Sequence, residues 1–263
     1  MKEVEVNIQR VREFWDARPC NLRHSPEAVG TRAYFDQVEA RKYFVEPHII
    51  PFANFHSWKN KKVLEIGCGI GTDAVNFARA GAFYTGVELS KESLQIAENR
   101  FKVFGLSGSF FEGDAENLDD SISLDQYDLI YSFGVLHHTP DIRRALKQIY
   151  KFCGAHTQLK IMVYAANSWK QLMINAGLDQ PEAQFGCPIA NSYTRMEIES
   201  ILQSSGFKLE HVSQDHIFPY EVESYRSYNY VKLPWFDKMP AEVMKVLESN
   251  FGWHLLIDAS VAQ

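Results

Sequence analysis

Residues 63–73 read VLEIGCGIGTD, and this stretch decides the fold of the chain. It begins like a buried strand that carries one acid, Glu65, and it ends where a helical pattern begins. Between the two stand Gly67, Gly69 and Gly71. A strand that enters a helix through a glycine-rich turn brings backbone N–H groups and the helix N-terminus together, at the sheet edge where open α/β folds bind ligands. We therefore predict a ligand site at this turn.

The spacing of the glycines, and the acid before them, indicate the kind of ligand. The dinucleotide fingerprint is G-x-G-x-x-G, whereas the glycines of this turn fall as G-x-G-x-G. Glu65 would be a poor neighbour for a pyrophosphate, but it suits a cationic amino group. The turn therefore favours a ligand that carries an ammonium.

Composition argues against several classes of function. The 263 residues are 46% hydrophobic, which suits one domain with a single core. The net charge is −6 and no Lys/Arg-rich run occurs, so we expect no nucleic-acid partner. No apolar stretch is long enough to span a bilayer, and acids stand where a signal peptide would be apolar. We expect an unprocessed cytoplasmic protein that does not engage a membrane.

The cysteines predict neither a disulfide framework nor a metal site. They lie far apart, and they form neither a CxxC pair nor a Cys/His cluster with the spacing of metal ligands. We expect reduced thiols and no bound metal. The four residues are Cys20, Cys68, Cys153 and Cys187.

Short apolar runs alternate with helical stretches from residue 62 to residue 161, which indicates βαβ units and a parallel sheet. One further helix and two further strands follow. The sequence therefore predicts an α/β fold that is Rossmann-like, with a seven-stranded, mostly parallel sheet and helices on both faces. The strands are expected at 62–66, 83–89, 108–114, 127–133, 157–164, 208–214 and 253–261.

Three segments fall outside the alternating pattern. We expect residues 1–60 to form an N-terminal helical cap or lid, and residues 61–263 to form the main domain. The main domain then carries two insertions, at about 165–192 and at about 214–249, of which the second is rich in tyrosine.

Four motifs in a fixed order resemble those of the class I S-adenosylmethionine-dependent methyltransferases, in the small-molecule branch of that family. The resemblance implies that S-adenosylmethionine is the cofactor, that S-adenosylhomocysteine is the product, and that the last strand is antiparallel. The motifs are VLEIGCGIGTD (63–73), GVELS (86–90), GDAENL (113–118) and YDLIYSFGVLHHTPD (127–141).

The resemblance covers residues 62–165 closely, and residues 194–213 and 251–262 more loosely. It implies that Glu65 meets the ammonium of the cofactor and that Glu88 accepts both ribose hydroxyls. A simpler interpretation makes Glu88 a partner of a helix dipole, and it gives the adenine-side aspartate at position 114 a structural role in its turn. The implied cofactor-binding residues are Glu65, Gly67, Cys68, Gly69, Gly71, Glu88, Leu89, Asp114, Ala115, Ser132 and Phe133.

Two histidines follow the fourth strand, where the acceptor pocket should begin. An imidazole titrates close to neutral pH, so His137 or His138 is a candidate base for a hydroxyl or ammonium acceptor. The alternative is structural: one ring packs under the sheet and the other bonds a carbonyl.

Aromatic side chains in the outlying segments are candidates for the rest of the pocket. In the resembling enzymes an aromatic hydroxyl of the N-terminal segment often meets the carboxylate of the cofactor. Tyr34 and Tyr43 could do so here, with Arg23 or Arg32 as ionic alternatives.

The second insertion contributes further aromatic candidates, because such side chains bury area while they keep a polar tip. They suit a small-molecule pocket and a homodimer interface equally well. The candidates for substrate binding are Tyr225, Tyr228 and Trp235.

We therefore predict an enzyme that transfers a methyl group from S-adenosylmethionine to a small-molecule acceptor, at oxygen, nitrogen or sulfur rather than carbon. No Asn-Pro-Pro-Tyr tetrapeptide follows the fourth strand, which weighs against amide and adenine amino substrates. One alternative is an NAD-dependent oxidoreductase, which the glycine spacing and Glu65 disfavour. The other is a cofactor-binding scaffold without turnover.

Overall fold

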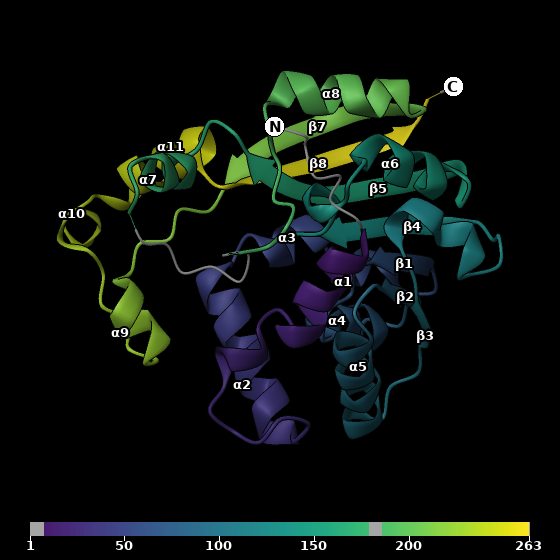
Figure 1. Cartoon of the computed structure of the whole chain (residues 1–263), viewed down its shortest axis with the longest axis horizontal. Helices are drawn as coiled ribbons and strands as arrows, with labels where there is room; N and C mark the ends of the chain where they lie inside the picture. The colour runs from purple at the N-terminus through teal and green to yellow at the C-terminus, as the bar shows by residue number, and fades with distance from the viewer. Residues whose placement is uncertain (1–7, 179–185, 263) are drawn as a thin grey trace.

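The computed structural model describes residues 8–178 and 186–262, and its centre is a twisted sheet (Figure 1). Seven strands follow the order β3-β2-β1-β4-β5-β8-β7, and β1 to β5 are mutually parallel. The last strand, β8, runs antiparallel to both β5 and β7, which confirms the expected topology. The strands are β1 Lys62–Ile66, β2 Phe83–Glu88, β3 Ser109–Glu112, β4 Tyr127–Phe133, β5 Cys153–Ala165, β7 Phe207–Asp215 and β8 His254–Val261.

The sheet differs from the predicted one in two details. An eighth strand of two residues, β6 Ser192–Tyr193, pairs with β5 at the end of the first insertion. The strand β5 is also longer than expected, because it begins at Cys153 rather than at Thr157. The prediction of seven strands was therefore wrong by one short strand.

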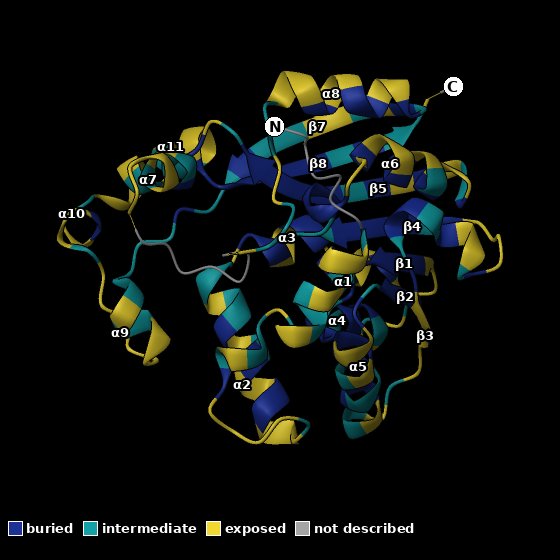
Figure 2. Ribbon diagram, viewed as in Figure 1, coloured by how far each residue is buried: buried dark blue, intermediate teal, exposed yellow. Residues whose placement is uncertain are grey.

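Side chains alternate between two apolar cores on the two faces of the sheet. Leu64 and Ile130 face the core under α6 and α8, whereas Val63, Leu129 and Tyr131 face the core under α3 and α4. Figure 2 shows these central strands buried between helices whose outer faces are exposed. The α-helices are α1 Ile8–Ala17, α2 Arg32–Val45, α3 Ile49–Ala53, α4 Thr72–Arg79, α5 Lys91–Phe104, α6 Ile142–Tyr150, α7 Trp169–Asn175, α8 Arg195–Ser204, α9 Val222–Arg226, α10 Pro234–Asp237 and α11 Ala241–Phe251.

Capping chemistry accounts for the boundaries of two helices. The hydroxyl oxygen of Ser90 accepts a hydrogen bond from the Ser93 N–H at the start of α5, and Gly105 ends that helix with a left-handed φ of 65°. Thr194 begins α8 with a full capping box that it shares with Glu197. Local sequence therefore determines where these helices begin and end.

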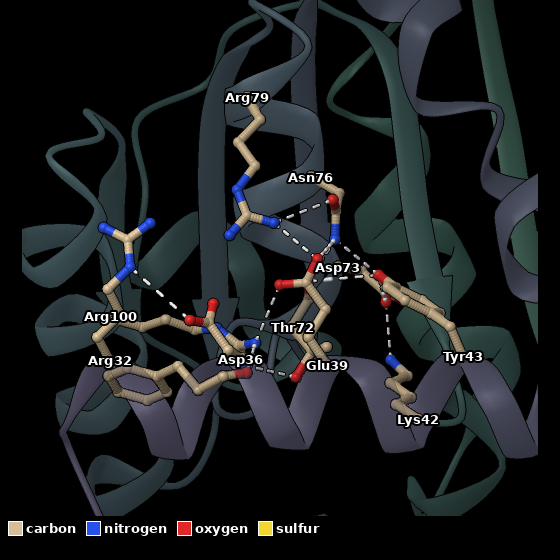
Figure 3. Close-up of polar contacts among 11 residues, drawn as sticks. Arg32, Asp36, Glu39, Lys42, Tyr43, Thr72, Asp73, Asn76, Arg79 and Arg100 are labelled. Carbon is tan, nitrogen blue, oxygen red and sulfur yellow. Dashed lines mark hydrogen bonds and ion pairs between the residues drawn. The ribbon is translucent and has the colours of Figure 1, made fainter.

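Polar contacts fix the N-terminal segment to the main domain (Figure 3). The guanidinium of Arg100, fully buried in α5, donates to Thr72 Oγ1 at 2.7 Å and to the Phe35 carbonyl at 3.0 Å. Glu39 of α2 forms ion pairs with both Arg79 and Arg100. We infer that α2 packs as an integral part of the main domain.

The two insertions hold the remaining helices. The first contains α7 and β6, and its residues 179–185 lie outside the described part of the chain. The second contains α9 to α11, which extend to one side of the sheet (Figure 1). In the described ranges, no helix is both long and apolar enough to cross a membrane.

Candidate functional site

The three glycines of the turn after β1 all adopt a positive φ. The φ angles of Gly67, Gly69 and Gly71 are 74°, 54° and 77°, in the left-handed region that favours glycine. A Cβ atom on Gly67 would lie 2.3 Å from Val135 Cγ2, whereas one on Gly69 would meet nothing within 4 Å. Gly67 therefore permits close packing, and Gly69 leaves open space beside the backbone.

That open space belongs to a cavity of about 710 Å³ at the carboxyl ends of the central strands. Parallel α/β sheets bind ligands at this edge. Gly71 and Ser132 are the two predicted cofactor residues that do not line it: Gly71 packs on Ala97, and the Ser132 hydroxyl donates to the Ile66 carbonyl. The predicted residues that do line the cavity are Glu65, Gly67, Cys68, Gly69, Glu88, Leu89, Asp114, Ala115 and Phe133.

Glu88, the last residue of β2, is held rigidly at the cavity wall. Its Oε2 accepts the Gly69 N–H at 2.8 Å, and its Oε1 accepts the Ser90 N–H at 2.9 Å. Burial raises the pKa of Glu88, and these two backbone donors oppose that rise. The carboxylate is thus oriented with free lone pairs on both oxygens, which suits two adjacent hydroxyl donors.

Glu65 lies deeper in the same cavity and is 3% exposed. Its Oε2 accepts a hydrogen bond from the Tyr84 hydroxyl at 2.7 Å. Burial, reinforced by the negative charge of Asp73, raises the pKa of Glu65 to about 8. A cationic ligand group beside it would reverse this shift, so the site is chemically matched to an ammonium.

Asp114 lines the cavity, but its carboxylate already has local partners. Its Oδ1 accepts the Glu116 N–H at 2.9 Å, and its Oδ2 accepts the side-chain amide of Asn117 at 2.8 Å. Asp114 therefore acts as a cap for the short helix η3 Ala115–Asp120. Contact with an adenine amino group would use a second lone pair of one of these oxygens.

The two predicted histidines occupy different environments. His137 is fully buried and its ring stacks on Tyr164, with ring centroids 3.6 Å apart. Within residues 8–178 and 186–262 neither of its ring nitrogens has a hydrogen-bond partner, and it does not line the cavity. Burial lowers the pKa of His137 far below its usual range. A role for His137 as the base loses support, because the residue is buried away from the cavity lining.

His138 does line the cavity. Its Nδ1 lies 2.5 Å from the Ile189 carbonyl oxygen, which places the proton on Nδ1 and leaves the Nε2 lone pair free to accept a proton. Burial lowers the pKa of His138 to about 4, so its imidazole is neutral across the physiological range. Of the two histidines, His138 is therefore the one that lines the cavity.

Four of the predicted aromatic residues lie outside the cavity lining. The hydroxyl of Tyr34 donates to the Leu22 carbonyl, and that of Tyr43 donates to Asp73 Oδ1. The hydroxyl of Tyr228 donates to a backbone carbonyl, and Trp235 is 55% exposed on α10. The three hydroxyls are bonded elsewhere and the indole faces outward, so we do not assign these residues to the site.

Tyr225 does line the cavity, next to a residue that the sequence did not single out. The guanidinium of Arg41 lies 4.1 Å from the Tyr225 ring centroid and donates to its carbonyl oxygen. Its Nε and Nη1 atoms are buried and have no hydrogen-bond partner among the described residues. Arg41 lines the cavity and can therefore donate to an anionic group of a ligand.

A second group that the sequence did not predict also lies at the cavity. Glu46, His216 and His254 line it, and His48 contacts the rings of His216 and His254 without lining it. His48 Nε2 and His254 Nδ1 are 2.9 Å apart, although 206 positions separate the two residues. No spacing rule could find this group, because three distant segments supply its members.

Comparisons with known proteins agree with the geometry of the cavity. A sequence model of the methyltransferase domain family matches residues 38–212. A ubiquinone biosynthesis O-methyltransferase of Pectobacterium atrosepticum is 30% identical over 118 residues, which cover 44% of this chain and 48% of that protein. Its counterpart in Proteus mirabilis is 27% identical over 137 residues, which cover 51% and 56%. The chain thus spans about half the length of the curated relatives it matches.

Solved structures extend the likeness to nearly the whole chain. A magnesium protoporphyrin IX methyltransferase from Synechocystis PCC 6803, with bound S-adenosylhomocysteine, superimposes with a TM-score of 0.63. The match covers 97% of this chain and 100% of that one at 14% identity, so it shows a shared fold. The family match covers more than half of the chain and includes the predicted cofactor residues. The chain therefore belongs to the methyltransferase domain family, and its fold is that of the class I S-adenosylmethionine-dependent methyltransferases.

Proposed function

We propose that this chain binds S-adenosylmethionine in the 710 Å³ cavity and methylates a small-molecule acceptor there. The observation that carries the proposal is the Glu88 carboxylate, which Gly69 and Ser90 hold at the cavity wall with free lone pairs. Glu65 would receive the ammonium, and the backbone at Gly69 leaves space for the methionine part. When bound, S-adenosylmethionine supplies an electrophilic methyl group on a sulfonium.

The acceptor would occupy the part of the cavity that lies toward β5 and β8. Tyr164, Phe218, Tyr225 and Trp253 line this part and offer apolar area with few polar groups. Arg41 would bind an anionic substituent of the acceptor. These residues would hold the acceptor in line and exclude water, which is most of what methyl transfer requires.

His138 would remove the acceptor proton through Nε2. Its Nδ1–H bond to the Ile189 carbonyl fixes the tautomer and the orientation of the ring. Because burial keeps this imidazole neutral, it is ready to accept a proton at any pH near neutrality. The same burial makes the imidazolium unstable, so the proton must pass on to solvent in each turnover.

Calorimetric titration with S-adenosylhomocysteine and with NAD separates methyl transfer from the oxidoreductase alternative. We expect S-adenosylhomocysteine alone to bind. Glu88→Ala should weaken its binding by about 1.5–3 kcal/mol, because bonds from the ribose hydroxyls to a charged acceptor are lost. Glu92→Ala, in the first turn of the neighbouring helix, is the matched control. Equal binding by wild type and Glu88→Ala would remove Glu88 from the site and with it the main support for the proposal.

The cellular location and assembly remain predictions. All four cysteines are free, which is compatible with a reducing compartment such as the cytoplasm. Trp235 is exposed rather than turned into the cavity, which favours the homodimer interpretation of that residue over the pocket interpretation.

A further inference from the structure

Three imidazoles and one carboxylate meet beside the acceptor part of the cavity. Glu46 ends α2, His48 precedes α3, His216 follows β7, and His254 begins β8. Figure 1 shows α3 close to the end of β4, and Phe133 at that end contacts the His254 ring edge-on, with centroids 5.5 Å apart. The group therefore lies next to Phe133, one of the predicted cofactor residues.

One donor atom each from Glu46, His48 and His254 can be chosen so that all three lie within 4.8 Å of one another. Nε2 of His48 and Nδ1 of His254 are 2.9 Å apart. Two nitrogens that each lie about 2.1 Å from one cation subtend about 90° at that separation, which is the angle between neighbouring ligands of an octahedral site. In the structure these two nitrogens share a hydrogen bond, so a cation would take the place of the shared proton, and the rings would turn to direct both lone pairs at it.

Carboxylates lie near both imidazoles. Asp215 Oδ1 lies 3.9 Å from His48 Nδ1, a separation that favours a proton on Nδ1 and a lone pair on Nε2 without a direct hydrogen bond. Glu46 Oε1 lies 3.8 Å from His254 Nε2, and the Glu46 side chain is 20% exposed, which leaves it room to turn toward a cation. His48 and His254 are 7% and 4% exposed, so water competes little for a bound ion.

His216 adds backbone strain to the same place. Its φ is 74°, in the left-handed region that non-glycine residues rarely occupy. Its ring stacks on His254 with centroids 4.7 Å apart and lies 5.4 Å from the ring of His48. Strain of this kind concentrates at functional sites, and here it keeps a third imidazole beside the pair.

We propose that Glu46, His48 and His254 bind a divalent first-row transition metal as a two-histidine, one-carboxylate site, with open positions toward the acceptor. Its role rests on the proposed function: the cation would bind an acceptor oxygen and lower the pKa of its hydroxyl. The acceptor proton would leave to His138, which lines the same cavity and, like His254, lies beside the Tyr164 ring. The acceptor would then be a molecule with a hydroxyl group and a second oxygen close to it, so that both oxygens can bind the metal ion.

Cobalt binding tests the site without any turnover. The purified wild-type chain is dialysed against Co²⁺, and the visible absorption bands and the metal-to-protein ratio are measured. We expect one Co²⁺ per chain with distinct ligand-field bands. His254→Gln and Glu46→Gln should each weaken binding at least tenfold, whereas His156→Ala, which removes an exposed histidine of β5, should bind as the wild type does.

Binding of S-adenosylhomocysteine to the same samples separates the two proposals. Variants that still bind S-adenosylhomocysteine but lose Co²⁺ support the metal site. Glu46→Gln is nearly isosteric, so it keeps the test valid should His254→Gln fail to fold. A wild-type chain that takes up no Co²⁺ or Mn²⁺, or cluster variants that take up as much as wild type, would overturn the metal site. A wild-type chain that did not bind S-adenosylhomocysteine would instead contradict the proposed function.

Discussion

The buried acid in β1 makes ligand binding depend on pH in a direction that the structure fixes. The pKa of Glu65 is raised to about 8, because the side chain is buried near Asp73. An ammonium partner requires the ionised form, and about one tenth of the free protein holds that form at pH 7, against about one hundredth at pH 6. The affinity for S-adenosylhomocysteine should therefore rise about tenfold from pH 6 to pH 7, and it should level off above about pH 8.

Isothermal titration calorimetry in buffers of different ionisation enthalpy measures this effect directly. We expect the release of about one proton per ligand bound at pH 7. Glu65→Gln should remove both the proton release and the pH dependence, and it keeps an acceptor for the Tyr84 hydroxyl. Methylthioadenosine, which lacks the amino group, should release no proton in the wild type. Binding of S-adenosylhomocysteine with no proton release and no pH dependence would refute the ammonium role of Glu65.

The same raised pKa has a consequence for stability. The folded state holds the Glu65 proton between the ordinary value of 4.5 and about 8, whereas the unfolded state releases it. The free energy of unfolding should therefore fall as pH rises through this window, by up to about 1.4 kcal/mol per pH unit from this group. Chemical denaturation of Glu65→Gln at pH 5 and pH 8 should show a smaller fall than the wild type does.

Five further substitutions test the site and the contacts that support it. Gly69→Val should fold but lose S-adenosylhomocysteine binding in calorimetry, because the valine side chain enters open space at the cavity. Gly67→Ala should lower the free energy of unfolding by about 1–3 kcal/mol, because its Cβ clashes with a neighbouring valine. His138→Ala should lower kcat by about 10²–10⁴-fold on a hydroxyl acceptor, whereas His137→Ala should mainly lower the melting temperature. If His138→Ala kept the wild-type kcat across pH 6–9, His138 would be structural. Arg100→Met should lower the free energy of unfolding by about 2–3 kcal/mol in urea denaturation, because it removes the charged hydrogen bonds that join α5 to α4 and α2. A variant as stable as the wild type would show that these contacts contribute nothing to stability.

Local signals in the sequence predicted the sheet, and most of the residues that they singled out for the cofactor line the cavity. A few neighbouring residues are enough to determine each of these features: the glycine turn, the acid at the end of β2, and the caps of α5 and α8. The strand β6 was missed because two residues carry no periodicity. Local patterns are thus sufficient where a short stretch of chain determines its own conformation.

The acceptor half could not be predicted, because tertiary contacts assemble it. Tyr43 was a reasonable candidate for the cofactor carboxylate, yet packing turns its hydroxyl to Asp73. The pairing of His48 with His254, and of Arg41 with Tyr225, joins segments that share no spacing. His137 and His138 are adjacent in sequence, but only the fold decides which of them reaches the cavity.

The position of α2 bears on how acceptor specificity could be exchanged between related enzymes. Within about one and a half turns this helix provides Arg41 to the aromatic wall, Lys42 to Asp73 at the glycine turn, and Glu46 to the histidine group. The Arg41 contact also ties it to α9 in the second insertion. A chimaera that exchanged either segment alone would break this junction, so substrate preference should be transplantable only when residues 8–60 and 214–253 move together.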